Sequence, residues 1–316
     1  MKKQKLIVFL LLSLLLCFFF FPSICFSGAK GGLTLWFYTI IPSLLPFLIV
    51  SNLILHLNLL PYLTPILAPF FQKIFSVSKA GCYPILIGLL SGYPMGAKAC
   101  ADLVRKGDIS KKEGQYLLSF VNNASPMFIT SFVATQCLEL PSMQYIFYGL
   151  ILGSAYLCSL IFGLFLRKKV SKTSESITET NIIEHTNNLS FATALDASIL
   201  DAFTTITKIG GFIILFSILG EFVLALPFHL GFLRYLLLCI LEITTANHFI
   251  SLSTYSMNIK IILNLATTTF GGLSGLFQTQ SVIAGSGLSL TYYIFMKLLQ
   301  SLLVVFGTIL LLIFIT

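Results

Sequence analysis

Long apolar runs separated by short polar stretches dominate the chain. The runs cover 6–21, 33–55, 60–76, 81–97, 115–136, 144–166, 206–228, 232–248, 259–286 and 289–314. Most approach the ~20 residues with which an α-helix crosses a bilayer. Strands of a β-barrel would instead alternate polar and apolar residues over about ten positions. The pattern therefore predicts an all-α polytopic membrane protein with about ten transmembrane segments.

Composition and charge agree with this class. Of the 316 residues 57% are hydrophobic and only 9% are charged, against about 25% charged in soluble domains. The net charge is +8, and basic residues cluster beside apolar runs at 2–5, 98–112 and 167–172. Because cytoplasmic loops favour Lys and Arg, we place these clusters and both termini in the cytoplasm. We expect a multi-pass protein of the cell membrane, with the lipid bilayer and not nucleic acid as its partner.

The first two runs each raise a question. Run 6–21 is either a retained first helix or the core of a signal peptide, with Ser27 and Ala29 at a cleavage site. Its length exceeds the 7–15 residues or so of a typical signal core, which favours a transmembrane anchor over 1–30. Pro42 and Pro46 lie inside run 33–55, so this helix should be kinked or interrupted.

The chain divides into two similar halves around the polar, Ser/Thr-rich stretch 167–190, which we interpret as a cytoplasmic linker. "LSG" at 90–92 recurs at 273–275, each time in the third of four apolar runs. With the N-terminus inside, the halves have opposite orientations. This predicts two inverted repeats, each with a broken or re-entrant helix. The predicted units are an anchor (1–30), a first repeat (31–143), a connecting helix and linker (144–205) and a second repeat (206–316).

The broken segments are the first candidate site. "SGYPMGAK" at 91–98 and "FGGLSGLFQTQSVIAGSG" at 270–287 put glycine, proline and polar residues into apolar surroundings. Irregular backbone at membrane depth needs cover from protein or from a water-filled cavity. A polar solute could satisfy the freed backbone groups, whereas close packing of glycines between helices would need no solute. The matched breaks favour a site.

Run 115–136 adds polar side chains at mid-span. Asn122, Asn123 and Ser125 precede Pro126, and amides offer both donors and acceptors to a ligand or to another helix. Because neighbouring helical positions point about 100° apart, we expect at least one asparagine to face the cavity and the other a neighbouring helix. The predicted substrate-binding residues are Ser91, Gly92, Tyr93, Pro94, Gly96, Lys98, Asn122, Asn123, Ser125, Ser274, Gln278 and Gln280.

Charges inside the runs are few. Glu242 lies well inside run 232–248 and is either a coupling site for H⁺ or Na⁺ or a buried structural carboxyl. Lys297 can extend its ammonium toward the membrane surface. The seven cysteines form no C-x-x-C pair and the four histidines are scattered, so we expect no metal site and no cofactor. Motifs of hydrolases and metalloproteases are absent from the sequence, and we expect a protein that is not an enzyme.

Three stretches resemble a known family: "KGGLTLWFYTIIPSLLPFLIVSNLI", "GLLSGYPMGAKACADLVRKGDISKKEGQYLLSFVNNASPMFI" and "GLSGLFQTQSVI". They are similar to the sporulation integral membrane proteins of YlbJ type, in the nucleoside-recognition, or Gate, domain group. That group includes membrane parts of concentrative nucleoside transporters and of ferrous-iron transport proteins. The resemblance implies an endospore-forming Firmicute and a role in spore development.

Two functions follow as hypotheses. The first is a transporter or permease for a small polar solute, for example a nucleoside-like compound, that alternates access around the paired breaks. The second is a non-transporting membrane scaffold for assembly of the spore cortex or envelope. A transporter needs its mid-membrane polar groups to face one cavity, whereas a scaffold can scatter them. A homo-oligomer is compatible with both.

Overall fold

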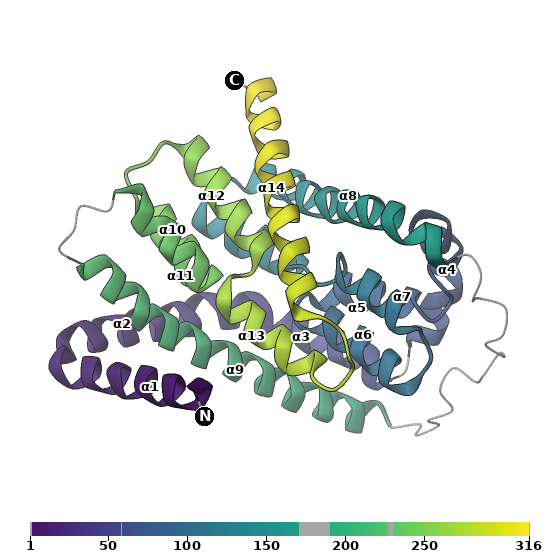
Figure 1. Cartoon of the computed structure of the whole chain (residues 1–316), viewed down its shortest axis with the longest axis horizontal. Coiled ribbons are helices and arrows are strands. Elements are labelled where there is room, and N and C mark those ends of the chain that lie inside the picture. The colour runs from purple at the N-terminus through teal and green to yellow at the C-terminus, as the bar shows by residue number, and fades with distance from the viewer. Residues whose placement is uncertain (1, 58, 171–189, 227–230, 316) are drawn as a thin grey trace.

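A computed structural model of the chain describes residues 2–57, 59–170, 190–226 and 231–315 (Figure 1). These residues form helices and no strand. Helix α1 (Lys2–Phe20) is followed by α2 (Pro22–Leu35), and the chain bends by 102° between them. Pro22 opens α2, where its missing N–H costs nothing. Residues 22–32, which the apolar pattern left between two segments, are therefore helical.

A π-helical turn, η1 (Trp36–Ile40), joins α2 to α3 (Ile41–His56) without a break in the helix. The turn lies just before Pro42, whose ring crowds the carbonyl one turn earlier, and a widened turn relieves such crowding. The irregularity expected from the prolines thus takes the form of a π turn. The helix runs on through Pro46.

Helices α2 and α3 pack along α9 (Phe191–Ala225), a helix from the other half of the chain (Figure 1). A Cβ atom on Gly28 would lie 2.6 Å from the Cα of Ile218, and one on Gly32 would lie 2.9 Å from the Cα of Ile214. The two glycines are one turn apart, so they let the two backbones touch. Here the close packing of glycines is the structural role.

The remaining helices of the first half are short except for the last, α8. They are α4 (Leu60–Phe75), α5 (Cys82–Ser91), α6 (Met95–Lys106), α7 (Lys111–Leu118), π-helical η2 (Phe128–Cys137), η3 (Pro141–Met143) and the long α8 (Gln144–Val170). Helices α5 and α6 fold back on one another, and a Cβ on Gly96 would lie 3.2 Å from the Cα of Gly88. Segment 119–127, whose backbone is irregular over 119–125 and helical again at 126–127, separates α7 from η2.

After α9, the second half continues with α10 (Phe232–Leu241), α11 (Ile243–Leu252), α12 (Met257–Phe270), α13 (Gly272–Ile283) and α14 (Leu290–Ile315). Tyr255, just beyond α11, meets the rings of Phe232 and Tyr235 in the first turn of α10. Helices α10 and α11 therefore form an antiparallel pair. The expectation of one continuous segment over 232–248 is wrong, because Glu242 is extended (φ −158°, ψ 136°) and caps a new helix.

Both halves thus share one order: a helical hairpin, an interrupted helix and an unbroken long helix. In the first half these are α5–α6, α7–η2 and α8, and in the second α10–α11, α12–α13 and α14. The two "LSG" triplets hold different places in this order. Gly92 ends the first helix of a hairpin, whereas Gly275 lies in the first turn of α13.

Among the described residues, four helical stretches are long and apolar enough to cross a membrane: Pro141–Gly163, Phe191–Ala225, Met257–Ile283 and Leu290–Phe314. A fifth results if the bent pair Leu11–Phe20 and Pro22–Ile40 is one span. Other apolar helices, such as Cys82–Ser91 and Phe232–Leu241, have only 10–17 residues. Four to five spans are therefore supported by length, where the sequence predicted about ten. Most of the predicted linker, 171–189, lies outside the described residues.

Candidate functional site

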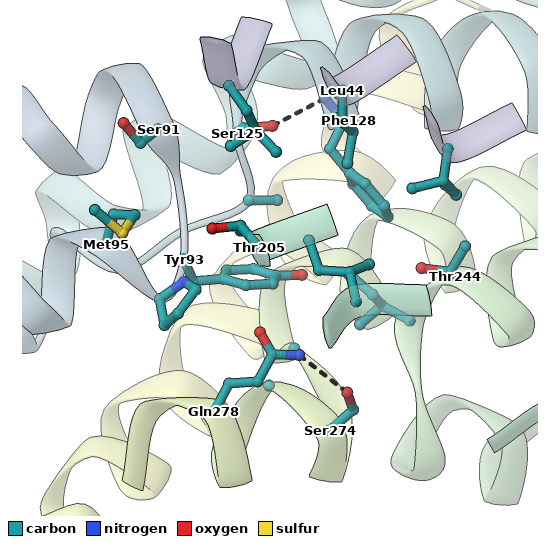
Figure 2. A pocket seen from close by; sticks show the side chains of 18 of the residues that line it. Leu44, Ser91, Tyr93, Met95, Ser125, Phe128, Thr205, Thr244, Ser274 and Gln278 are labelled. Carbon is teal, nitrogen blue, oxygen red and sulfur yellow. Dashed lines mark hydrogen bonds between the residues drawn. The ribbon is translucent and has the colours of Figure 1, made fainter. Parts of the chain in front are cut away.

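Four helix breaks meet at one cavity of about 60 Å³ (Figure 2). The lining residues come from the four breaks: the α5–α6 loop, segment 119–127, the α10–α11 junction and the α12–α13 junction. Residues of α3, η2 and α9 complete the wall. The polar lining comprises Ser91, Tyr93, Ser125, Thr205, Glu242, Thr244, Ser274 and Gln278. Pieces far apart in sequence therefore present hydroxyl, amide and carboxyl groups to one small space.

The α5–α6 loop is fixed against segment 119–127. Gly92 has φ 71°, and a Cβ there would lie 2.5 Å from the backbone nitrogen of Ser125, so only glycine fits. The next peptide bond, Tyr93–Pro94, is cis. The amide of Tyr93 donates to the carbonyl of Asn123 at 2.7 Å. These contacts hold the tip of the hairpin in place.

The side chain of Tyr93 enters the cavity from this tip (Figure 2). Its ring extends away from the loop, with the hydroxyl on the side where Thr244 is seen. The hydroxyl oxygen is buried and has no hydrogen-bond partner among the described residues. A buried phenol normally finds a partner, so this hydroxyl is available to a molecule in the cavity.

Glu242 lies at the α10–α11 junction and is only 4% exposed. Its carboxylate caps α11, because Oε2 accepts a hydrogen bond from the amide of Thr245 at 2.8 Å. Thr245 is held in turn by its hydroxyl contact with Ser217 of α9 at 3.0 Å. A Cβ on Gly272, the first residue of α13, would lie 3.2 Å from the Cα of Glu242. Within the described ranges no basic side chain forms an ion pair with Glu242.

Helix α13 supplies Ser274 and Gln278 from one face. Gln278 Nε2 donates to Ser274 Oγ at 3.2 Å (Figure 2). The N-cap of the helix is Gly271, which has φ 91° and offers no side-chain cap. Gln280, two positions beyond Gln278, is exposed and points away from this face.

Asn122 ties segment 119–127 to the second half of the chain. Its Nδ2 donates to the hydroxyls of Thr279 at 3.0 Å and Tyr293 at 2.8 Å, and its Oδ1 accepts from the amide of Ala97 at 3.3 Å. It is fully buried. The side chain therefore joins α6, α13 and α14 behind the cavity.

Asn123 lies in a second buried network. Its Oδ1 accepts from Lys297 Nζ at 2.8 Å and from Gln300 Nε2 at 2.9 Å. Lys297 is 1% exposed and also donates to Gln300 Oε1 at 2.9 Å. The ammonium thus lies inside the bundle, and the expectation that Lys297 reaches the membrane surface is wrong, because two amide oxygens hold it.

The predicted site residues fall into three groups. Those at the cavity are Ser91, Tyr93, Pro94, Ser125, Ser274, Gln278 and the proposed coupling residue Glu242. Packed behind it are Gly92, Gly96, Asn122 and Asn123, and exposed elsewhere are Lys98 and Gln280. Neither asparagine is among the lining residues, so their role in binding rests on sequence reasoning alone.

Sequence reasoning missed several lining residues. Thr244 could have been found, since it follows the one acidic residue deep in an apolar run. Thr205 sits in an ordinary helical stretch and carries no comparable signal. The apolar side chains that the prediction did not include are typical of any membrane helix and are Ile40, Leu44, Phe47, Leu48, Met95, Ala124, Phe128, Ile209 and Ile243.

Comparison with known proteins gives one informative match. The sporulation integral membrane protein YlbJ of Bacillus subtilis (strain 168) is 33% identical over an alignment of 216 residues, which covers 63% of this chain and 52% of that protein. The chain therefore spans about half the length of this curated relative. No protein-family model matches the chain, and no solved structure matches it.

The relative and the helices agree on the cellular setting. YlbJ is named an integral membrane protein, and the chain has several helices of membrane-spanning length and composition. The chain is a multi-pass membrane protein.

Proposed function

We propose that the chain is a transporter-type membrane protein that binds a small polar solute between its helix breaks. The convergence of four breaks on one polar-lined cavity is the observation that carries this proposal. Membrane transporters commonly build their sites from discontinuous helices near the bilayer midplane. Isolated structural breaks would have no reason to face a common space.

Repetition of the helix order supports a transport mechanism. A hairpin, an interrupted helix and a long helix occur in each half, on either side of the linker. We propose that the halves are inverted repeats of the Gate type. Access to the cavity would then alternate as one half moves against the other.

The setting we propose is spore development. It rests on the relative, which is named for sporulation, and on the resemblance of the "SGYPMGAK" and "FVNNASPMFI" stretches to that family. Movement of a solute across a membrane during sporulation is consistent with both the cavity and the name of the relative.

The test is a binding and uptake experiment. The protein is purified in detergent, and its melting temperature is measured with nucleosides, amino acids, small amines and inorganic salts. Compounds that stabilise it are then assayed for uptake into proteoliposomes. We expect at least one compound to raise the melting temperature saturably and to be taken up.

Two glutamines on α13 provide the matched variants. Gln278→Ala removes an amide from the cavity, whereas Gln280→Ala removes an exposed amide from the same helix. We expect only Gln278→Ala to weaken binding, by about tenfold for one lost hydrogen bond and an unpaired buried partner. A protein that binds and transports none of these compounds, while both variants still support sporulation, would refute the proposal and favour the scaffold.

A further inference from the structure

The ionisable side chains that line the cavity include an acidic residue but no basic one. The lining contains one acidic side chain, Glu242, and no Lys, Arg or His. The remaining polar groups are neutral hydroxyls and one amide. Lys297, the buried cation behind the first break, is held by Asn123 and Gln300 and is not part of the wall.

Glu242 acts as an acceptor in the contact that fixes it. The amide of Thr245 donates to its Oε2, and a carboxylate at the first turn of a helix is favoured by the helix dipole. Capping a helix through an acceptor oxygen suits the ionised form of the side chain. A cation held beside the carboxyl would favour this form further, because an opposite charge nearby stabilises a carboxylate.

Helix dipoles add little net charge at the cavity. Each junction brings the C-terminal end of one helix and the N-terminal end of the next to the same place: α5 and α6, α10 and α11, α12 and α13. The C-terminal end carries a partial charge of about −0.5 and the N-terminal end one of about +0.5, so the two contributions nearly cancel at each junction. Glu242 is therefore the one lining group that can carry a charge opposite to that of a bound cation.

An unpartnered phenol faces the same space. Tyr93 enters from the α5–α6 loop, and its buried hydroxyl oxygen has free lone pairs. Together with the hydroxyls of Ser274 and Thr244 it offers neutral oxygens beside one carboxylate. Such a set of oxygens suits a compact monovalent cation or a primary ammonium group.

The size of the cavity further limits the class of ligand that it can hold. A volume of about 60 Å³ is far below the 300–1,000 Å³ or so of pockets that hold drug-sized ligands. It has room for a few atoms the size of water.

Resting on the proposed function, we propose that the cavity binds a small positively charged group at Glu242, with Tyr93 as a neutral oxygen ligand. This group is either an inorganic cation such as Na⁺ or the ammonium head of a small amine. Both satisfy the same chemistry, and bulky or anionic solutes do not.

The experiment compares cations at constant ionic strength. Detergent-purified protein is melted in N-methylglucamine chloride, a bulky background salt, with increasing NaCl, KCl or methylammonium chloride in its place. Uridine and sodium-free phosphate serve as neutral and anionic probes. We expect one small cation to raise the melting temperature saturably, and phosphate to have no effect. Stabilisation by methylammonium but not by Na⁺ would identify an amine, and the reverse an inorganic cation.

Variants locate the effect. Glu242→Gln retains an oxygen that can cap α11 and removes the charge, so the half-saturating concentration should rise about tenfold or more. Tyr93→Phe should raise it by a smaller factor. Glu221→Gln, which changes a carboxyl on α9 away from the lining, should leave it unchanged. Gln278→Lys places an ammonium in the cavity and should abolish the response to added cations.

The outcomes separate this inference from the proposed function. If a cation stabilises Glu242→Gln and the unaltered protein equally, the cavity charge is not its ligand and the inference fails. If uridine stabilises both proteins equally, with a loss in Gln278→Ala, the solute site stands and the cation is excluded. If Glu242→Gln does not fold, an unchanged cation response in both Tyr93→Phe and Gln278→Lys refutes the inference. If no probe has any effect, both proposals fail.

Discussion

The two interrupted helices differ in how the polar groups at their breaks are used. Between α7 and η2 the chain leaves the helix over 119–125, and the side chains of Asn122 and Asn123 are used in hydrogen bonds to α13 and α14. Between α12 and α13 the break is one glycine, Gly271, with no side chain to cap it. The first break is held by its own polar groups, whereas the second leaves its polar face to the cavity. Intramembrane polar residues therefore need not be binding residues.

The largest effect should come from comparing the glycines of the two "LSG" triplets. Gly92→Ala forces a Cβ to 2.5 Å from the nitrogen of Ser125 at φ 71°, which should cost about 3 kcal/mol or more of stability. Gly275→Ala has open space around its Cβ and should fold normally. The yield of monodisperse protein after detergent extraction measures both. Equal yields would mean that the first break is not packed as described.

The network at the first break should give the next largest effect. Asn123→Leu removes an acceptor of the buried Lys297 ammonium and should lower the free energy of unfolding by about 3 kcal/mol. Adding Lys297→Met removes the group left without its partner. Thermal unfolding of the single and double variants should therefore show less loss in the double variant than the two single losses together. Simple additivity would contradict a coupled network.

At the second break the expected cost is smaller. Gly271→Ala meets no atom within 4 Å, so only its φ of 91° resists alanine, at about 1–2 kcal/mol. Gly211→Ala, in the middle of α9 and equally open, should instead gain up to about 1 kcal/mol from helix propensity. Opposite shifts in melting temperature are expected. A shift of Gly271→Ala as large as that of Gly92→Ala would erase the contrast between the breaks.

The smallest effect concerns Tyr293. Tyr293→Phe deletes one of two acceptors of Asn122 Nδ2 and leaves Thr279 in place. The loss should be about 1 kcal/mol, measured by unfolding in detergent. Binding at the cavity should be unchanged, because Tyr293 is not among its lining residues. A change in binding without a change in stability would bring this network into the site.

The sequence predicted the helical membrane class because the lengths of the apolar runs and the positions of charged residues are read directly from the sequence. It also pointed to the breaks at 91–98 and at 270–287, since Gly and Pro act through local backbone geometry. It missed the break at Glu242, where no Gly or Pro is present and a carboxylate caps the new helix. That break depends on the neighbouring Gly272 and on Ser217, which are distant in sequence or on another helix.

The candidate site divides in the same way. Ser274 and Gln278 were predicted and line the cavity, whereas Asn122 and Asn123 have the same polar character and lie behind it. The partners of the asparagines, such as Tyr293 and Gln300, come from a helix more than one hundred residues later. Local pattern gives the polarity of a side chain but not its partner, and here the partner decides its role.

The contact of α2 with α9 also constrains how the protein is made. Gly28 touches Ile218, so α2 cannot complete its packing until about 190 further residues have been synthesised. At the usual rates of synthesis this takes roughly 10–40 s. During that interval the glycine face of α2 has no α9 to pack against. Completion of the N-terminal part is thus tied to synthesis of the second half, and a chain truncated before α9 would present this face to quality control.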